Sequence, residues 1–131
     1  MDGMYDKQRK ISLLSIGLFM ICVIGVILET QFQVIRRAYD HFVLDNRNHY
    51  LSCRELPEKA KVERAVQQHQ DVLQQIQQVD PGSVGVEIDS FTCEGKADLL
   101  IWYGTHEQRI AIEKIINDDT FFDIPYRLQN R

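Results

Sequence analysis

The chain has 131 residues, 44% of them hydrophobic, and a formal net charge of −4. This length allows one small domain with an appendage. A nucleic-acid partner requires a basic patch or stripe, which an acidic chain with few clustered basic residues does not offer. We therefore expect no nucleic-acid partner.

An apolar run, ISLLSIGLFMICVIGVIL, fills residues 11–28 and contains no charged residue. Its length is at the lower limit for a helix that crosses a bilayer. A cleaved signal peptide would end in small residues, whereas this run ends in Val26, Ile27 and Leu28 before Glu29. The sequence thus predicts a short tail over residues 1–10 and an uncleaved signal anchor over residues 11–28, with the lipid bilayer as its partner.

Basic residues flank this run and predict its orientation. Lys7, Arg9 and Lys10 precede it closely, and basic residues near a span tend to stay on the cytoplasmic side. We expect a single-pass protein of the cell membrane with a cytoplasmic amino terminus and an extracytoplasmic carboxy-terminal domain.

A helical stalk is expected over residues 29–45. An apolar stripe with spacings of four and three residues continues past the anchor, which is typical of one helix face. Its members are Leu28, Phe32, Ile35, Tyr39 and Phe42. The stripe covers fewer than two heptads, which is too few to establish a coiled coil, and the sequence leaves open whether it forms a homodimer seam or packs on the following domain.

The remaining residues, 46–131, predict a small α+β domain. His49–Cys53 is a short strand candidate, and a helix follows Pro57, with apolar residues at helical spacing from Val62 to Val79. Asp80-Pro81-Gly82 ends that helix. Residues 84–88 alternate like a half-buried strand, and residues 97–103 are apolar like a central strand.

The carboxy-terminal part predicts a further helix and strand. Thr105 and Gln108 have the spacing of a capping box, and the helix should run to about Ile116. The last stretch, FFDIPYRL, alternates as a strand, and Pro125 places it at a sheet edge or itself at an unpaired position.

This order of elements, βαββαβ, matches the ferredoxin-like plan of an antiparallel sheet with two helices on one face. Without the weak first strand the order becomes αββαβ, which is also found in extracytoplasmic assembly modules. Because such folds host unrelated functions, the fold alone does not predict one.

Two cysteines outside the apolar run favour a structural rather than a catalytic role. A strand of seven residues spans roughly 23 Å at about 3.3 Å per residue, so Cys93 and His106 should lie at opposite ends of the sheet. A nucleophile and its base must lie within hydrogen-bond reach, which excludes this pair. Cys53 and Cys93 are instead expected to form a disulfide, as small extracytoplasmic domains commonly do.

No motif in the chain predicts an enzyme, a cofactor or a metal. The sequence contains no phosphate-binding loop, dinucleotide fingerprint or serine hydrolase elbow, and its four histidines are scattered without ligand spacing. We therefore expect no catalytic, cofactor-binding or metal-ligating residues.

A partner surface is expected on the sheet face opposite Val84. Its candidate residues are Glu87, Asp89 and Arg127, and Tyr126 of the aromatic group is a further candidate for partner contact. The sequence thus favours a membrane-anchored, non-catalytic module that binds proteins in the cell envelope. The alternative is a membrane-anchored dimeric sensor or binding module for a small ligand, with Phe32, Ile35, Tyr39 and Phe42 as its dimer stripe.

Overall fold

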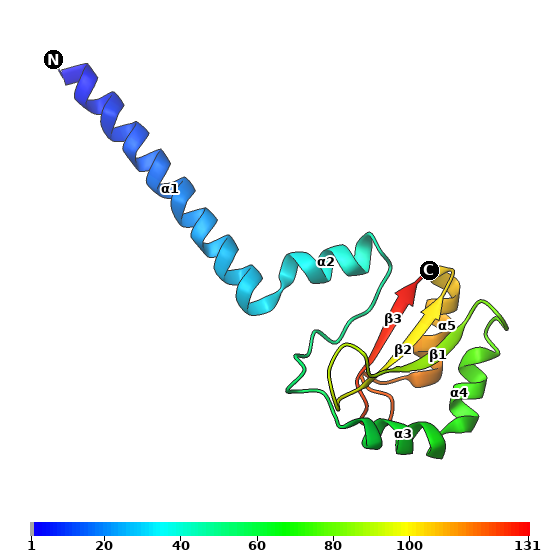
Figure 1. Ribbon diagram of the computed structural model, residues 1–131. Helices are drawn as coiled ribbons and strands as arrows, with labels where there is room; N and C mark the ends of the chain where they lie inside the picture. The colour runs from blue at the N-terminus through cyan, green and yellow to red at the C-terminus, as the bar shows by residue number, and fades with distance from the viewer. Residues whose placement is uncertain (1) are drawn as a thin grey trace. The chain divides into compact units, whose positions relative to one another are not determined.

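The computed structural model describes the backbone of residues 2–131 and the side chains of residues 14–30 and 33–131. The chain divides into two compact units, residues 1–39 and residues 40–131. Across the described backbone there are five helices and one three-stranded mixed sheet, so the protein belongs to the α+β class (Figure 1).

The amino-terminal helix is broken where the sequence predicted a continuous stalk. Helix α1 (Asp2–Phe32) ends before Gln33, which has a φ of 49°, and α2 (Val34–Phe42) follows. The Glu29 carboxylate accepts a hydrogen bond from the Ile35 amide at 2.9 Å. This side chain therefore replaces a carbonyl acceptor that a continuous helix would supply, and the prediction of one uninterrupted helix is wrong.

Several residues of the predicted anchor and stripe lie outside the described side chains, namely Lys7, Arg9, Lys10, residues 11–13 and Phe32. Within the part of the chain whose side chains are described, no single helix is long and apolar enough to cross a membrane. The bent pair Leu14–Thr30 and Val34–Phe42 meets the requirement of length and composition together.

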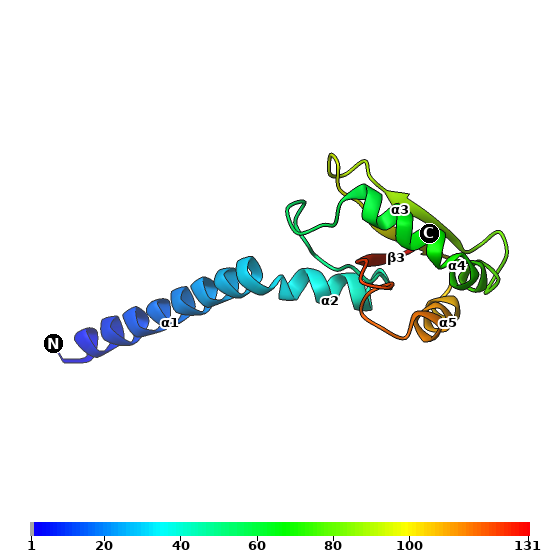
Figure 2. The same cartoon turned by 90° about the horizontal axis from the view of Figure 1, so that it is seen from below.

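The predicted helix from Val62 to Val79 is two helices, α3 (Lys59–Gln68) and α4 (Gln70–Gln77). They meet at His69, whose backbone leaves the helical region with φ −119° and ψ 37°. The His69 ring stacks on Phe122 with 3.4 Å between ring centroids. Figures 1 and 2 show the change of direction between α3 and α4. No glycine or proline marks this break, so a tertiary contact rather than local sequence accounts for it.

The sheet contains β1 (Gly85–Asp89), β2 (Asp98–Tyr103) and β3 (Tyr126–Asn130), with β2 in the centre. β1 and β2 are antiparallel and joined by a loop, whereas β2 and β3 are parallel. A parallel pair needs a long crossover, which α5 (His106–Ile116) supplies.

The ferredoxin-like arrangement is not confirmed. His49–Cys53 is not a strand, and Tyr50 has a φ of 56°, which a strand residue cannot adopt. In the ferredoxin-like plan the first strand separates the two strands on either side of the second helix. Here those strands, β2 and β3, bond to each other directly, so that position does not exist.

One hydrophobic core lies between the sheet and the helices. Leu99, Ile101 and Tyr103 alternate along β2 and pack with Val62 of α3 and Ile112 of α5. Because alternate strand residues share a face, α3, α4 and α5 all cover the same face of the sheet. The domain is therefore a two-layer structure whose other sheet face carries no helix.

Local sequence signals at α5 are confirmed. The Thr105 hydroxyl accepts a hydrogen bond from the Gln108 amide, and the Gln108 side chain accepts one from the Thr105 amide, which is the predicted capping box. Asn117 ends the helix in the left-handed conformation, with φ 50°.

The final strand is shorter than predicted. Phe122 and Asp123 have positive φ values of 49° and 64°, and Phe121 and Ile124 close a tight turn with reciprocal backbone hydrogen bonds. β3 begins only at Tyr126, so Pro125 lies just outside it. The missing amide of Pro125 consequently costs the sheet no hydrogen bond.

Candidate interaction surface

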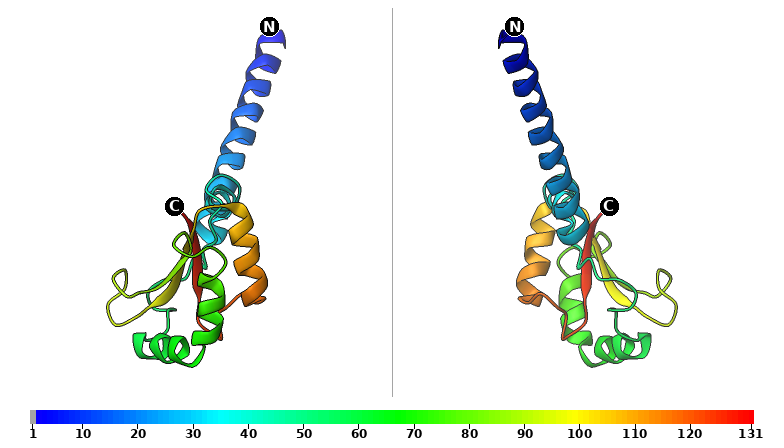
Figure 3. Two further views of the ribbon diagram at one scale, coloured as in Figure 1. Left: turned by 90° about the vertical axis from the view of Figure 1, so that its right-hand side faces the viewer. Right: turned by 90° about the vertical axis from the view of Figure 1, so that its left-hand side faces the viewer.

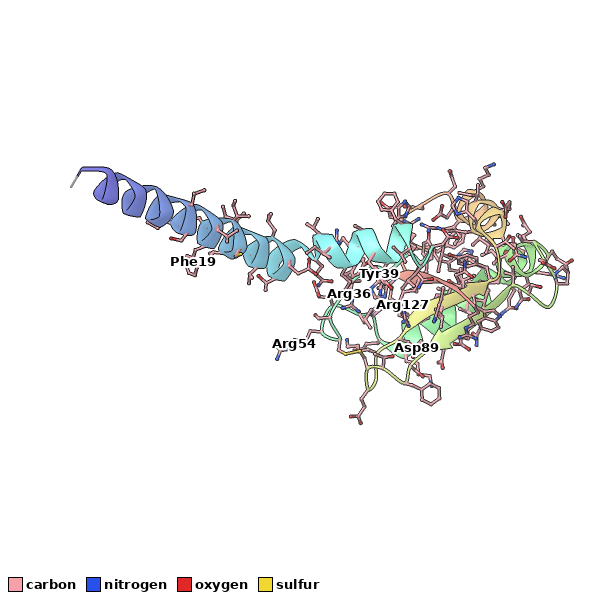
Figure 4. The ribbon with its side chains drawn as sticks, turned by 90° about the horizontal axis from the view of Figure 1, so that it is seen from above. Phe19, Arg36, Tyr39, Arg54, Asp89 and Arg127 are labelled. Atoms are coloured by element: carbon pink, nitrogen blue, oxygen red, sulfur yellow. A yellow bond between two sulfur atoms is a disulfide. The ribbon has the colours of Figure 1, made fainter. Side chains whose placement is uncertain are left out.

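Three of the four residues that were predicted to form a partner surface lie on the helix-free face of the sheet. The register places Glu87 of β1 beside Leu100 of β2, and Leu100 beside Arg127 of β3. Asp89 pairs in the same way with Asp98. Asp89 and Arg127 are labelled in Figure 4, where both belong to the sheet.

Arg127 connects two strands through a network of charged hydrogen bonds. Its Nε and Nη2 donate to the two carboxylate oxygens of Asp98, at 2.5 and 3.0 Å. The same Nη2 donates to Asp89 Oδ2 at 2.5 Å. Asp98 is only 2% exposed, so removal of Arg127 would leave a buried carboxylate without its arginine partner. The network therefore fixes the ends of β1, β2 and β3 relative to one another.

Both carboxyl groups in this network are held in the ionised form. Burial disfavours the charge on Asp98, but hydrogen bonds from His49 and Arg127 outweigh burial and lower the pKa of Asp98 below its ordinary value. Burial and the hydrogen bonds from Arg127 and Thr92 act in the same opposing way on Asp89, whose pKa is also lowered.

His49 belongs to this network as a structural residue. Its Nε2 lies 2.7 Å from Asp98 Oδ2, and its Nδ1 accepts a hydrogen bond from the Leu51 amide at 3.0 Å. An Nδ1 that accepts has no proton, so Nε2 carries the proton and donates to Asp98. Because both ring nitrogens are occupied, His49 has no free lone pair with which to act as a general base.

The turn that follows β1 is fixed by Asp89. Its Oδ1 accepts hydrogen bonds from the amides of Phe91 and Thr92 at 3.0 and 3.4 Å, and its Oδ2 accepts one from the Thr92 hydroxyl at 3.0 Å. Such a side chain replaces backbone acceptors and stabilises a turn. Arg127 holds the same carboxylate, so the ion network of the sheet continues into the turn.

A disulfide fixes the other half of this loop. Cys53 and Cys93 are bonded, as the sequence predicted, with 5.5 Å between their Cα atoms. Next to it, the Lys59 amide donates to the Gly95 carbonyl at 3.1 Å and the Ala97 amide to the Pro57 carbonyl at 3.1 Å. Figure 3 shows the loop between β1 and β2 projecting on the side away from α5. We call residues 89–96 the stapled loop.

Phe91 lies at the exposed part of the stapled loop, and 99% of its surface is accessible to solvent. The neighbouring backbone is fixed by Asp89 and by the disulfide, so this large apolar ring is presented by an ordered segment. Phe91 was not among the predicted surface residues, because alternation along strands identifies strand residues and Phe91 lies in a turn. Its signal was an aromatic residue inside an otherwise polar turn, DSFTCEG.

The four predicted surface residues have different environments. Tyr126 is only 2% exposed and its hydroxyl donates to the Asp118 carbonyl at 3.1 Å, so it is a core residue and cannot contact a partner. Asp89 and Arg127 are mostly buried in the ion network. Glu87 is exposed and lies 3.7 Å from Arg131. Of the four residues, Glu87 alone is therefore exposed, Asp89 and Arg127 belong to the ion network, and Tyr126 lies in the core.

Trp102 covers the far end of the same face. Its register partner is Gly85, and a Cβ atom built on Gly85 would lie 2.0 Å from the indole ring. Glycine is thus required here because the ring lies directly over its backbone. The Arg131 guanidinium lies 4.8 Å from the ring centroid on this face.

A second ion cluster fixes the segment that enters the domain. Arg109 of α5 is 4% exposed and donates to Asp45 Oδ1 at 2.8 Å and to Glu113 Oε1 at 3.2 Å. His106 Nδ1 lies 2.8 Å from the same Asp45 oxygen, and the Tyr103 hydroxyl donates to the Asp45 carbonyl. Burial raises the pKa of Tyr103 to about 12, and this hydroxyl stays protonated.

Cys93 and His106, the pair considered for catalysis, both have structural partners. Cys93 has no free thiol, and His106 bonds to Asp45. Among residues with described side chains, no group of three histidine, cysteine or carboxylate side chains could hold a metal ion.

Comparison with known proteins gives no relative for this chain. No family model, no curated protein and no solved structure matches it.

Proposed function

We propose that this protein is a membrane-anchored, non-catalytic module that binds another protein in the cell envelope through the stapled loop. The observation that carries this proposal is Phe91, a fully exposed aromatic side chain on a loop fixed by a disulfide and an ion network. Aromatic anchors of this kind contribute most to binding when they are presented without a large loss of conformational entropy.

The anchor part of the proposal rests on residues 11–28. From Leu14 to Leu28 the described helix exposes large apolar side chains on all its faces, and Figure 4 shows Phe19 standing out from α1. A helix that is apolar all round needs an apolar environment. Lys7, Arg9 and Lys10 support a cytoplasmic amino terminus, and the disulfide fits an oxidising extracytoplasmic compartment.

Labelling of intact cells with a membrane-impermeant maleimide tests the orientation. We expect Cys53 and Cys93 to react only after reduction, because both would then lie outside in a disulfide. Labelling that requires cell lysis would place the domain in the cytoplasm and refute this part of the proposal.

Photocrosslinking tests the interaction. A benzophenone amino acid at position 91 of the full chain in its native membrane should give a discrete adduct, whereas the same group at the exposed Gln75 should not. Phe91→Ala should reduce co-purification of the crosslinked protein roughly ten- to thirty-fold, the effect of losing a binding hot spot. Glu94→Ala, in the same loop, is the matched control and should change it little. Equal adducts at positions 91 and 75, or no adduct at 91, would refute the contact.

A dimeric sensor or binding module for a small ligand is the second candidate. It is favoured by Ile35, Tyr39 and Phe42 of α2, which are 67%, 53% and 82% exposed in the single chain. If α2 is a dimer seam, Ile35→Asp combined with Tyr39→Asp should convert a dimer to a monomer in analytical ultracentrifugation. A parent protein that is monomeric at micromolar concentration would refute this candidate.

A further inference from the structure

The two edges of the sheet differ in a way that the proposed function does not use. On the outer edge of β3, the amide and carbonyl of Arg47 form reciprocal hydrogen bonds with Leu128, at 2.9 and 2.8 Å. The Asn130 amide also donates to the Asn46 side chain at 2.8 Å. This edge is covered by the chain itself.

The outer edge of β1 has no such cover. β1 pairs only with β2, and within residues 33–131 no backbone hydrogen bond joins another segment to its outer edge. Exposed strand edges pair readily with other chains, and natural proteins usually protect them with lysine, proline or a covering loop. β1 has neither lysine nor proline, and its two charged residues, Glu87 and Asp89, are both acidic.

A groove of about 590 Å³ lies along this open edge, between β1 and the helices α3 and α4. Its apolar lining consists of Val66, Leu73, Val86, Ile88 and Leu99. Its polar lining consists of Gln70, Asp71, Gln74, Gln77 and Glu87. Apolar side chains and an unpaired strand edge therefore lie together, as binding of an extended peptide to a sheet edge requires.

The charge of the groove indicates its occupant. None of its lining residues is basic, and Asp71 and Glu87 carry the only charges. A segment with alternating apolar and basic side chains would place the apolar set in the groove and the basic set on the helix-free face, beside the Glu87 carboxylate. A second copy of this acidic chain offers a less suitable charge.

We propose that the β1 edge and the adjoining groove bind an extended segment of a partner protein, with alternating apolar and basic residues, as a fourth strand of the sheet. This inference rests on the proposed interaction role, and it adds the conformation and the charge of the segment that is bound. The groove does not include Phe91, so the two contacts can be tested separately.

The test uses the full chain, ¹⁵N-labelled in detergent micelles, and a heptapeptide of alternating lysine and valine. We expect the amide signals of Gly85–Asp89 to shift in a saturable way. Alternate residues of an extended peptide direct their amides to opposite edges, and only one edge faces β1. N-methylation of one set, the lysines or the valines, should therefore weaken binding at least about ten-fold, whereas methylation of the other set should have a smaller effect. A peptide of alternating glutamate and valine should bind more weakly than the lysine peptide.

Variants of the groove give a matched pair. Gln74→Arg with Gln77→Arg places two positive charges in the groove and should weaken binding of the lysine peptide roughly five-fold. Gln75→Arg with Gln78→Arg adds the same charge to exposed positions outside the groove lining and should leave binding within about two-fold.

Three results would overturn the inference: no shift on β1 at millimolar peptide, equal binding by both methylated peptides, or equal effects of the two charge variants. Dimers formed through β1 would also overturn it, since the occupant would then be a second copy. If the peptide does not bind β1 but the photocrosslinked adduct at position 91 still forms, the groove proposal alone is refuted. If no adduct forms at position 91, the proposed function is refuted.

Discussion

The disulfide between Cys53 and Cys93 should provide a large part of the stability of the carboxy-terminal domain. It joins residues separated by 40 positions. A cross-link that closes a loop of this length removes about 4 kcal/mol of conformational freedom from the unfolded chain. Domains of this size have total stabilities of roughly 5–15 kcal/mol, so loss of the bond should lower the midpoint of thermal unfolding by roughly 15–30 °C.

The measurement is urea unfolding of the parent protein and of the variants Cys53→Ala and Cys93→Ala, followed by the fluorescence of Trp102, the only tryptophan. Both variants lose the same loop constraint, and Cys93→Ala also loses the packing of a buried sulfur. We therefore expect two large effects, with that of Cys93→Ala the larger. A loss below about 1 kcal/mol in both variants would contradict the loop-entropy reasoning. The parent protein in reducing agent is the control and should unfold as Cys53→Ala does.

Three further predictions concern charges and caps. Asp98→Ala should destabilise the domain by about 3–5 kcal/mol in urea unfolding, because Arg127 would remain partly buried without its main partner; an effect below about 1 kcal/mol would contradict this role. The pKa values of Asp45, Asp89 and Asp98 are lowered in the folded state, so their contribution to stability is present above their ordinary pKa near 4 and is lost as pH falls through the lower folded values. Unfolding followed between pH 6 and pH 2 should show this loss, and stability that stays constant over the range would argue against the networks. Thr105→Ala should cost about 1 kcal/mol, since it removes the cap of α5, whereas a neutral effect would show that the cap contributes nothing.

Local signals predicted the elements whose ends are encoded by neighbouring residues. The capping box of Thr105 and Gln108 predicted the start of α5, and the apolar run predicted the central strand β2. The disulfide was also predicted, because only two cysteines lie outside the apolar run. These features depend on residue spacing or on composition, and both can be read directly from the sequence.

Tertiary contacts explain two of the elements that the sequence predicted wrongly. The predicted strand at His49–Cys53 does not form because His49 turns to bond with Asp98 and Tyr50 adopts a left-handed conformation. The break at His69 accompanies a ring contact with Phe122, more than fifty positions away. Neither partner could be identified from local pattern.

The candidate surface was predicted in part for the same reason. Alternation along β1 correctly placed Glu87 and Asp89 opposite the core. It could not predict that Asp98, at the start of an apolar strand, would pair with Arg127 and withdraw that residue from the surface. Alternation along the last strand grouped Tyr126 with Ile124 and Leu128, which are all buried, so naming Tyr126 as a surface residue was wrong.

The unequal edges of the sheet limit how far this protein can polymerise. Ordered fibres need a sheet that accepts a strand at each edge, so that growth continues in both directions. Here Arg47 and Asn46 cover β3, whereas in the described part of the chain no segment bonds to the outer edge of β1. Edge pairing therefore stops after one addition: one partner strand per chain, or at most two chains joined back to back. Crowding of these domains on a surface would accordingly not extend the sheet into filaments.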